Sequence, residues 1–187
     1  DGRVVERRGE LDRTTSMKHD GAGRLVESST GKATTKYEWG DKGLPAKATL
    51  PDGMVYSFEW DQYGRLAAQL CPDGTRTNWR YLGAGPDLLA SVERVSSDGQ
   101  TKSTTAYGYD PWGRLAKISR PDGRSESASY DSSNMVSRTF PNGKTYKYSY
   151  DAARSKVSEQ SPDKARTLYS YDFMGKPVKT VYPDKTA

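Results

Sequence analysis

In the stretch YGYDPWGRLAKISRPDGRSESASYD, residues 107–131, a tyrosine followed by an aspartate recurs after a single Pro-Asp-Gly turn. Tyr109-Asp110 is the first pair and Tyr130-Asp131 is the second. The recurrence has two possible meanings: a Tyr–Asp pair of an active site, or a structural unit that has been copied. The spacing of the same residues along the rest of the chain distinguishes between them.

The unit is copied along nearly the whole chain. The residue that follows the recurrent aromatic stands at Asp20, Gly40, Asp61, Leu82, Asp110, Asp131, Asp151 and Asp172. Successive anchors are 20 or 21 residues apart, except for one longer step that holds an insertion around residues 83–100. Just before the anchor, seven of the eight copies have an aromatic: Trp39, Trp60, Tyr81, Tyr109, Tyr130, Tyr150 and Tyr171. A fixed period of this kind is the signature of a repeat architecture.

Two turns punctuate each copy. Glycine stands three residues after the anchor in six copies, Gly113 and Gly175 among them, which predicts a backbone position with positive φ. Asn134 fills the slot in one copy, and Arg154 marks a degenerate copy. About eleven residues after the anchor comes a second turn, such as Pro121-Asp122-Gly123, with "STG" ending at Gly31 and "SDG" ending at Gly99 in the same slot. Pro-Asp-Gly is typical of a type I turn closed by glycine.

The segments between the turns are short, alternate with period two and are rich in Tyr, Trp, Phe and Thr, which is typical of strands. The sequence therefore predicts an all-β array of about eight β-hairpins of 20–21 residues that form a curved antiparallel sheet. The aromatics one and three residues before the anchor share a face, and we expect them to stack across neighbouring strands. We expect the anchor aspartates Asp110, Asp131, Asp151 and Asp172 to accept backbone N–H groups of their turns.

The composition bounds the class of protein. The chain has 187 residues, enough for one domain or two small ones, and only 33% are hydrophobic, so a thick core is hard to build. The 11% of aromatics argue against disorder. The net charge of +5 is spread along the chain, which favours a solvated surface over a nucleic-acid-binding arm. No apolar run approaches a membrane span.

The quoted motifs resemble a known family. YDPWGRLAKISRPDG, residues 109–123, and YSYDFMGKPVKTVYPDK, residues 169–185, resemble the YD repeats of the rearrangement-hotspot (Rhs) family, and the resemblance covers about residues 17–187. It implies a hollow β-shell that encloses a toxic domain, as in bacterial polymorphic toxins and insecticidal toxin complexes, with related shells in teneurins and cell-wall-associated proteins. It also implies secretion or delivery by a bacterial system such as type VI secretion, in bacterial competition, with a cell-surface location as the alternative.

The resemblance sets the expected organisation and partners. We expect residues 1–187 to be one YD-repeat segment of a larger shell, with an irregular leading repeat at residues 1–16. The expected partners are further YD repeats of the same or another chain, an enclosed toxin domain and secretion-spike proteins. Asp110-Pro111-Trp112-Gly113 matches one of the two Asp-Pro-x-Gly motifs of the family's autoproteolytic segment, but no second copy follows it, so protease activity is not expected.

Several residues could carry chemistry instead. His19 precedes Asp20, but it fills the aromatic slot and has no nucleophile in context, and Cys71 precedes a Pro-Asp-Gly turn as an ordinary strand-end residue. The aspartates lack the spacing of calcium loops, and turn chemistry explains them. We therefore expect no enzyme activity, no cofactor and no metal. Two functions stay open: a shell segment that protects a toxic effector, or a module that binds carbohydrate or a cell surface through its aromatic face.

Overall fold

The computed structural model describes residues 4–8, 14–85 and 87–183, and these residues form antiparallel strands joined by turns, without a helix. The chain divides into two compact units, residues 1–104 and 105–187, which are described separately. The predicted fold class, an all-β array of antiparallel hairpins, is confirmed. Within the described ranges, no helix has the length and apolarity needed to cross a membrane.

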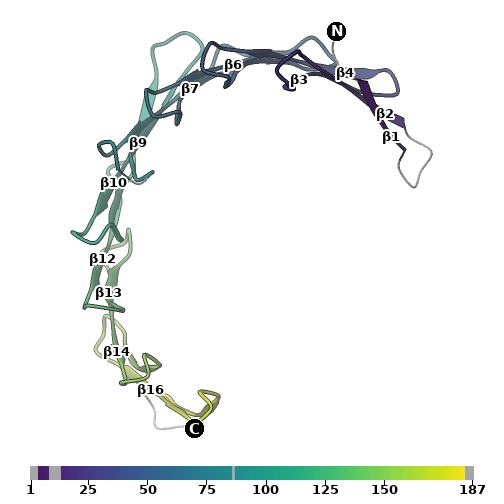
Figure 1. Cartoon of the computed structure of the whole chain (residues 1–187). Coiled ribbons are helices and arrows are strands. Elements are labelled where there is room, and N and C mark those ends of the chain that lie inside the picture. Colours follow the sequence, from purple (N-terminus) through teal and green to yellow (C-terminus); the bar gives the residue numbers. More distant parts are fainter. Residues whose placement is uncertain (1–3, 9–13, 86, 184–187) are drawn as a thin grey trace. The chain divides into compact units, whose positions relative to one another are not determined.

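The first unit is one antiparallel sheet in which each strand pairs with the next along the chain, and Figure 1 shows it as a curved layer, coloured purple to teal. Its strands are β1 (Val4–Arg8), β2 (Thr14–His19), β3 (Leu25–Thr30), β4 (Ala33–Trp39), β5 (Pro45–Thr49), β6 (Val55–Trp60), β7 (Leu66–Leu70), β8 (Arg76–Tyr81) and β9 (Leu89–Val95). The predicted leading repeat at residues 1–16 falls partly outside the described residues, and its described part includes β1, which pairs with β2.

The second unit has the same design, coloured green to yellow in Figure 1. Strand β10 (Lys102–Tyr109) crosses the division, and its residues 105–109 begin this unit. The strands that follow are β11 (Leu115–Ser119), β12 (Ser125–Tyr130), β13 (Met135–Thr139), β14 (Thr145–Tyr150), β15 (Lys156–Gln160), β16 (Arg166–Tyr171) and β17 (Pro177–Val181). Each again pairs with its sequence neighbour, so all contacts between strands are local hairpin contacts.

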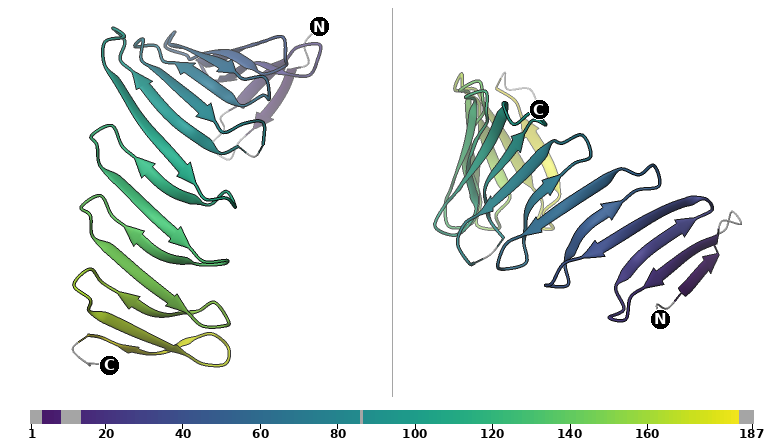
Figure 2. Two further views of the ribbon diagram at one scale, coloured as in Figure 1. Left: turned by 90° about the vertical axis from the view of Figure 1, so that its left-hand side faces the viewer. Right: turned by 90° about the horizontal axis from the view of Figure 1, so that it is seen from above.

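Neither unit has a hydrophobic core in the described residues. The strands of each unit lie side by side in one layer (Figure 2), and no large side chain is fully buried. Among these residues only Ala68, 2% exposed, and Ser158, 7% exposed, are buried. Stability therefore comes from contacts between neighbouring hairpins rather than from packing between layers.

Every aromatic strand meets the strand after it through a β-bulge. In the pair β10–β11, Gly108 lies opposite Lys117 and Tyr109 lies opposite Leu115, so Ala116 is the extra residue. The same one-residue shift recurs at the end of β2, β4, β6, β8, β12, β14 and β16. The skipped residue is alanine or valine in every copy: Val26, Ala46, Ala67, Ala90, Ala116, Val136, Val157 and Val178. A bulge bends its strand and increases the local twist, so a bulge in every repeat favours curvature of the sheet.

The turn residues mostly adopt the predicted backbone. Gly113 and Gly175 have φ of 79°, and Gly123 has φ of 80°. Arg154, expected to break the pattern, keeps it, because its φ is 66°; Lys164 likewise holds a glycine slot with φ of 71°. An L-residue in this left-handed region is strained by its Cβ.

Two expectations about the glycine slot are wrong. Asn134 does not have positive φ, because its corner is one residue shorter: the N–H of Asp131 bonds to the carbonyl of Asn134, whereas the N–H of Asp110 bonds to that of Arg114. Gly85, one of the six slot glycines because it stands three residues after the anchor Leu82, does not have positive φ either: the insertion reshapes its corner and the left-handed residue is Gly83.

The insertion around residues 83–100 is not one loop. Part of it widens the corner, where the N–H of Leu82 bonds to the carbonyl of Leu88. The rest lengthens the strands, because β9 has 7 residues and β10 has 8, against 5 and 6 in β7 and β8. The "STG" turn also differs from the Pro-Asp-Gly turns, because Thr30 pairs directly with Ala33 across a two-residue turn.

Candidate functional site: the joint between hairpins

The anchor aspartate organises its corner with both carboxylate oxygens. In the corner at Asp110, Oδ1 accepts the backbone N–H groups of Trp112 at 3.0 Å and Arg114 at 2.9 Å, and Oδ2 accepts Nε of Arg114 at 2.7 Å. The backbone N–H of Gly113 donates to the carbonyl of Asp110 at 3.0 Å. The predicted role of the aspartate as a turn cap is confirmed. The same arrangement, arginine included, recurs at Asp20–Arg24 and Asp61–Arg65.

These contacts keep the aspartates ionised. The N–H of Arg24 and its guanidinium hold the pKa of Asp20 below the ordinary value. At Asp61 and Asp110 partial desolvation acts to raise the pKa, but the bonds from the arginine four residues on outweigh it and the pKa is lowered. Asp131 lacks the arginine, and the N–H groups of Asn134 and Ser133 lower its pKa. A carboxylate occupied by several donors is a poor proton shuttle, so the corner is suited to a structural role.

The arginine then reaches the aromatic that ends the next aromatic strand. The guanidinium of Arg65 lies 4.4 Å from the ring centre of Tyr81, and that of Arg114 lies 4.4 Å from the ring centre of Tyr130. A second ring, from the corner itself, also contacts each arginine. The ring centre of Tyr63 lies 4.9 Å from the guanidinium of Arg65, and that of Trp112 lies 5.2 Å from the guanidinium of Arg114. Cation–π contacts of this kind stabilise by about 0.5–1 kcal/mol when exposed.

The aromatic completes the connection with a hydrogen bond back to the preceding hairpin. The hydroxyl of Tyr130 donates to the carbonyl of Leu115 at 2.8 Å, fifteen residues earlier. Tryptophan does the same with its indole, since Nε1 of Trp39 donates to the carbonyl of Leu25 at 2.8 Å. The other donors and acceptors are Trp60 to Pro45, Tyr81 to Leu66, Tyr150 to Met135 and Tyr171 to Lys156. We call this hydrogen bond the joint, together with the corner aspartate and the cation over the ring where the corner supplies them. The aspartate, the arginine and the hydrogen bond occur together at Trp39, Tyr81 and Tyr130.

The aromatic columns are therefore held differently from the prediction. Ring stacking between columns was expected, but in the described part of the chain the rings in close contact are Phe140 and Tyr146, with centres 5.5 Å apart, and neither stands just before an anchor. The columns are instead separated by cations. The reason is spacing, because neighbouring aromatic strands are two strands apart and an arginine or lysine side chain fills the interval.

A lysine separates two aromatics of the other column, three residues before the anchor. Nζ of Lys156 lies 5.6 Å from the ring centre of Tyr148 and 4.8 Å from that of Tyr169, and it binds Oε2 of Glu159 at 2.6 Å. The hydrogen bond that Lys156 donates to Glu159 raises the pKa of Lys156. Burial, with the nearby Glu159 charge, raises the pKa of Tyr148. The repeat with Arg154 in its glycine slot thus keeps a cation between its aromatics by other means.

The remaining predicted residues lie where the repeat places them. Tyr109 ends β10 opposite Leu115. At the opposite corner, Asp122 accepts the N–H of Arg124 at 3.0 Å, and the Arg124 guanidinium lowers the Asp122 pKa. His19 pairs with Leu25 at a bulge, and Cys71 is a half-buried free thiol contacted by Gln69. In the residues that the structure describes, no three His, Cys, Asp or Glu side chains gather where they could hold a metal ion.

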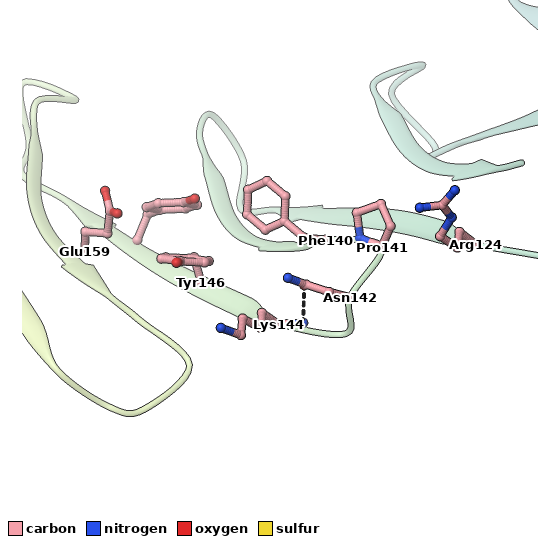
Figure 3. Close-up of a pocket in the computed structure, with 8 residues that line it drawn as sticks. Arg124, Phe140, Pro141, Asn142, Lys144, Tyr146 and Glu159 are labelled. Carbon is pink, nitrogen blue, oxygen red and sulfur yellow. Dashed lines mark hydrogen bonds between the residues drawn. The ribbon is translucent and has the colours of Figure 1, made fainter.

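The aromatic face of the second unit also carries a pocket of about 700 Å³ (Figure 3). Phe140, Pro141 and Tyr146 supply its apolar wall, and Arg124 and Glu159 lie at opposite ends. Its other lining residues are Asn142, Lys144 and Tyr148. Such a pocket offers ring faces together with donors and acceptors, and no single sequence motif marked it, because two strands, β14 and β15, and two turns contribute.

Comparison with known proteins agrees with the repeat. Residues 87–125 match the family model described as RHS Repeat. Residues 87–125 thus carry an RHS repeat. The matched residues include the corner at Asp110 and the Pro121-Asp122-Gly123 turn, and the corners at Asp20, Gly40, Asp61, Asp151 and Asp172 have the same backbone hydrogen bonds as that at Asp110.

Two curated relatives of this chain are named as toxins. The chain is 31% identical over 148 residues to "Toxin protein Tse5" of Pseudomonas aeruginosa and 27% identical over 151 residues to "Double-stranded DNA deaminase toxin A" of Burkholderia cenocepacia, in each case covering 75% of this chain and 10% of the relative. It is also 28% identical over 120 residues to a protein of Clavibacter sepedonicus named as a tRNA-2-methylthio-N(6)-dimethylallyladenosine synthase, of which the match covers 22%. The chain thus spans a tenth to about a fifth of the length of these relatives.

The fold of this chain matches part of one chain in a solved toxin structure. A chain in the structure of the Photorhabdus luminescens Tc holotoxin pore superimposes with a TM-score of 0.64 at 14% identity, over 90% of this chain and 12% of that one. The similarity supports the fold, a curved antiparallel sheet of hairpins.

Proposed function

We propose that this chain is a non-catalytic wall segment of a shell that encloses a toxic effector domain and protects it during export and delivery into target cells. The observation that carries the proposal is the joint, repeated in sheets that have no core of their own. Relatives named as toxins and a structural neighbour in a holotoxin support it.

The proposed mechanism is containment. Neighbouring strands are tied by main-chain pairing, and six of the copies add a joint, so a wall of one layer resists local opening although no second layer supports it. A wall of this kind can exclude proteases and the producer's own substrates from the cargo. Delivery by a bacterial secretion system, with further RHS repeats and spike proteins as partners, belongs to the same proposal.

The experiment uses the full-length protein that contains this chain. Limited proteolysis of the wild-type protein should leave a downstream domain intact, whereas a triple variant, Tyr130→Ala, Tyr150→Ala and Tyr171→Ala, should expose that domain because three joints are lost. A matched variant with Tyr107→Phe should behave as wild type. If the protease cleaves the downstream domain of the wild-type protein as fast as that of the triple variant, containment is rejected.

The pocket at Phe140 favours a second function, binding of a carbohydrate. Sugar rings pack on aromatic faces while polar groups bind their hydroxyls, and Phe140, Tyr146 and Glu159 provide both kinds of group. Glycan-array binding by the chain, lost in Tyr146→Ala and Tyr148→Ala variants that keep their β-structure, would support this function. Absence of glycan binding by the folded wild-type chain would reject it.

A further inference from the structure

The face opposite the aromatic columns differs between the two units. In the first unit this face carries charges in opposite pairs: Lys18 with Glu27 at 2.7 Å, Lys47 with Glu38 at 3.4 Å, and Arg76 with Glu59 at 2.6 Å. These cations are largely neutralised by their neighbours. The first unit therefore presents a mixed surface with little preference for the charge of a partner.

In the second unit hydroxyl groups replace the ion pairs. The position two residues before the anchor is Ser129 in β12, Ser149 in β14 and Ser170 in β16, with Gly108 in β10, where the first unit has Lys18, Glu38, Glu59 and Arg80. Oγ of Ser129 bonds to Oγ of Ser137 at 2.6 Å, and Oγ of Ser158 donates to Oγ of Ser149 at 3.0 Å. Each pair of hydroxyls keeps one hydrogen that it can donate to another acceptor.

Cations lie beside these hydroxyls on the same face. The strand register places Ser137 opposite Lys147, Lys147 opposite Gln160, and Gln160 opposite Arg166. Lys147 and Arg166 are exposed, and no ion pair joins either to a carboxylate within the described ranges. Lys117 and Lys179 stand on the same face in β11 and β17 by their pairing with Gly108 and Ser170.

The carboxylates of the second unit do not balance these cations. Its described strands contain two, Glu126 and Glu159, and both alternate to the aromatic face, where they bind arginine or lysine. In the adjoining turn, Asp163 is occupied by the hydroxyl of Ser161 and the N–H of Ala165. The face is thus basic and rich in hydroxyls.

The face is also hollowed. A pocket of about 420 Å³ is lined by both serine pairs, Lys147, Gln160 and Arg166, together with Val136 and Tyr148. A second, of about 410 Å³, shares Lys147 and Gln160 and adds Thr145 and Lys164, with Gly143, Ser161 and Pro162. The two pockets share Lys147 and Gln160, so they adjoin each other on this face. An extended ligand fits two adjoining pockets better than a compact one does.

We propose that this serine–lysine face binds an acidic polypeptide segment of the enclosed domain. Carboxylates repeated along an extended chain match both the cations and the free hydroxyl hydrogens, and charge complementarity of this kind selects partners. The inference rests on the proposed function, because it names the chemistry of the wall's partner. It assigns the second unit as the part of the wall that holds cargo, whereas the self-neutralised first unit does not.

The test measures fluorescence anisotropy of a labelled decaglutamate peptide with the full chain. Binding should weaken at high ionic strength. The double variant Lys147→Gln with Arg166→Gln should weaken binding about tenfold. Lys144→Gln, which removes a cation from the pocket on the aromatic face, is the matched control and should leave binding unchanged.

A charge-reversal variant tests whether the sign of the charge on this face selects the ligand. A folded variant with Lys147→Glu and Arg166→Glu should lose decaglutamate and gain binding of decalysine. The inference fails if decaglutamate does not bind, if Lys144→Gln weakens binding as much as the double variant, or if decathymidylate binds more tightly with the same dependence on Lys147 and Arg166.

The two proposals fail separately. Protection of the downstream domain without decaglutamate binding retains containment and rejects the acidic partner. Decaglutamate binding without protection rejects containment.

Discussion

The hydroxyl of Tyr130 donates to the carbonyl oxygen of Leu115 at 2.8 Å, so the end of the aromatic strand β12 is fastened to the start of β11, the strand immediately before it. Tyr130→Phe should lower the free energy of unfolding by about 0.5–1.5 kcal/mol, because it removes one hydrogen bond and keeps the ring over Arg114. Urea denaturation measures the loss. Tyr107→Phe is the control, because the Tyr107 hydroxyl has no hydrogen-bond partner among the described residues; equal losses in the two variants would contradict the joint.

The contact between Arg65 and Tyr81 should show energetic coupling. Arg65 is held by Asp61 and covered by Tyr81, so its removal and the removal of the ring should not be additive. A double-mutant cycle with Arg65→Met and Tyr81→Leu should give a coupling energy of about 0.5–1 kcal/mol. The pair Arg65 and Tyr56, which share no contact, should give none; additivity at Arg65 and Tyr81 would show that the ring only fills space.

Glycine should stabilise the chain at two positions. Arg154 and Lys164 hold left-handed backbone with φ of 66° and 71°, and glycine removes the Cβ strain. Arg154→Gly and Lys164→Gly should each raise the free energy of unfolding by about 1 kcal/mol. Asn134→Gly is the matched control, because Asn134 occupies the aligned slot without positive φ; a gain there equal to the others would refute the assignment.

Acid should weaken the array through its corners. The pKa values of Asp20, Asp61, Asp110 and Asp131 are lowered below the ordinary value of 3.8, so their ionised forms favour the folded state. A lowered folded-state pKa gives stability that is present above the unfolded-state pKa and lost as the pH falls through the folded-state pKa. The melting temperature should therefore fall steeply below about pH 4.

The control for the acid effect removes the carboxylates. The variant Asp61→Asn with Asp110→Asn should be less stable than wild type at neutral pH, and the difference should shrink in strong acid, where the wild-type carboxylates are protonated as well. A difference that stays constant across the titration would assign the acid sensitivity to other groups.

Period, strands and turns could be predicted from sequence because each depends on local chemistry. Pro121-Asp122-Gly123 sets a turn by its own backbone preferences, and Tyr109 and Tyr130 alternate with small residues as strand residues do. The hydrogen-bonding role of Asp110 follows in the same way. These features need no knowledge of the neighbouring repeat.

The joint could not be predicted in full because it connects two repeats. Nothing local to Arg114 indicates that its guanidinium lies between Trp112 and Tyr130 rather than in solvent. The bulge had a signal, the unbroken column of alanine or valine exemplified by Ala116 and Val157, but the column becomes visible only when the copies are aligned through their unequal corners. The same inequality explains the wrong expectation for Asn134, since counting from the anchor ignores the residue that its corner lacks.

The reach of the joint has a consequence for how the chain acquires its structure. Tyr130 needs only Leu115, and Tyr150 only Met135, each fifteen residues earlier. Contacts so close in sequence require little loop closure, and topologies built from them fold quickly. We expect each hairpin to lock onto its predecessor as soon as it leaves the ribosome, so nascent chains arrested at increasing lengths should gain protease resistance one repeat at a time. Folding would then proceed from the N-terminus to the C-terminus, at the rate at which the chain is synthesised.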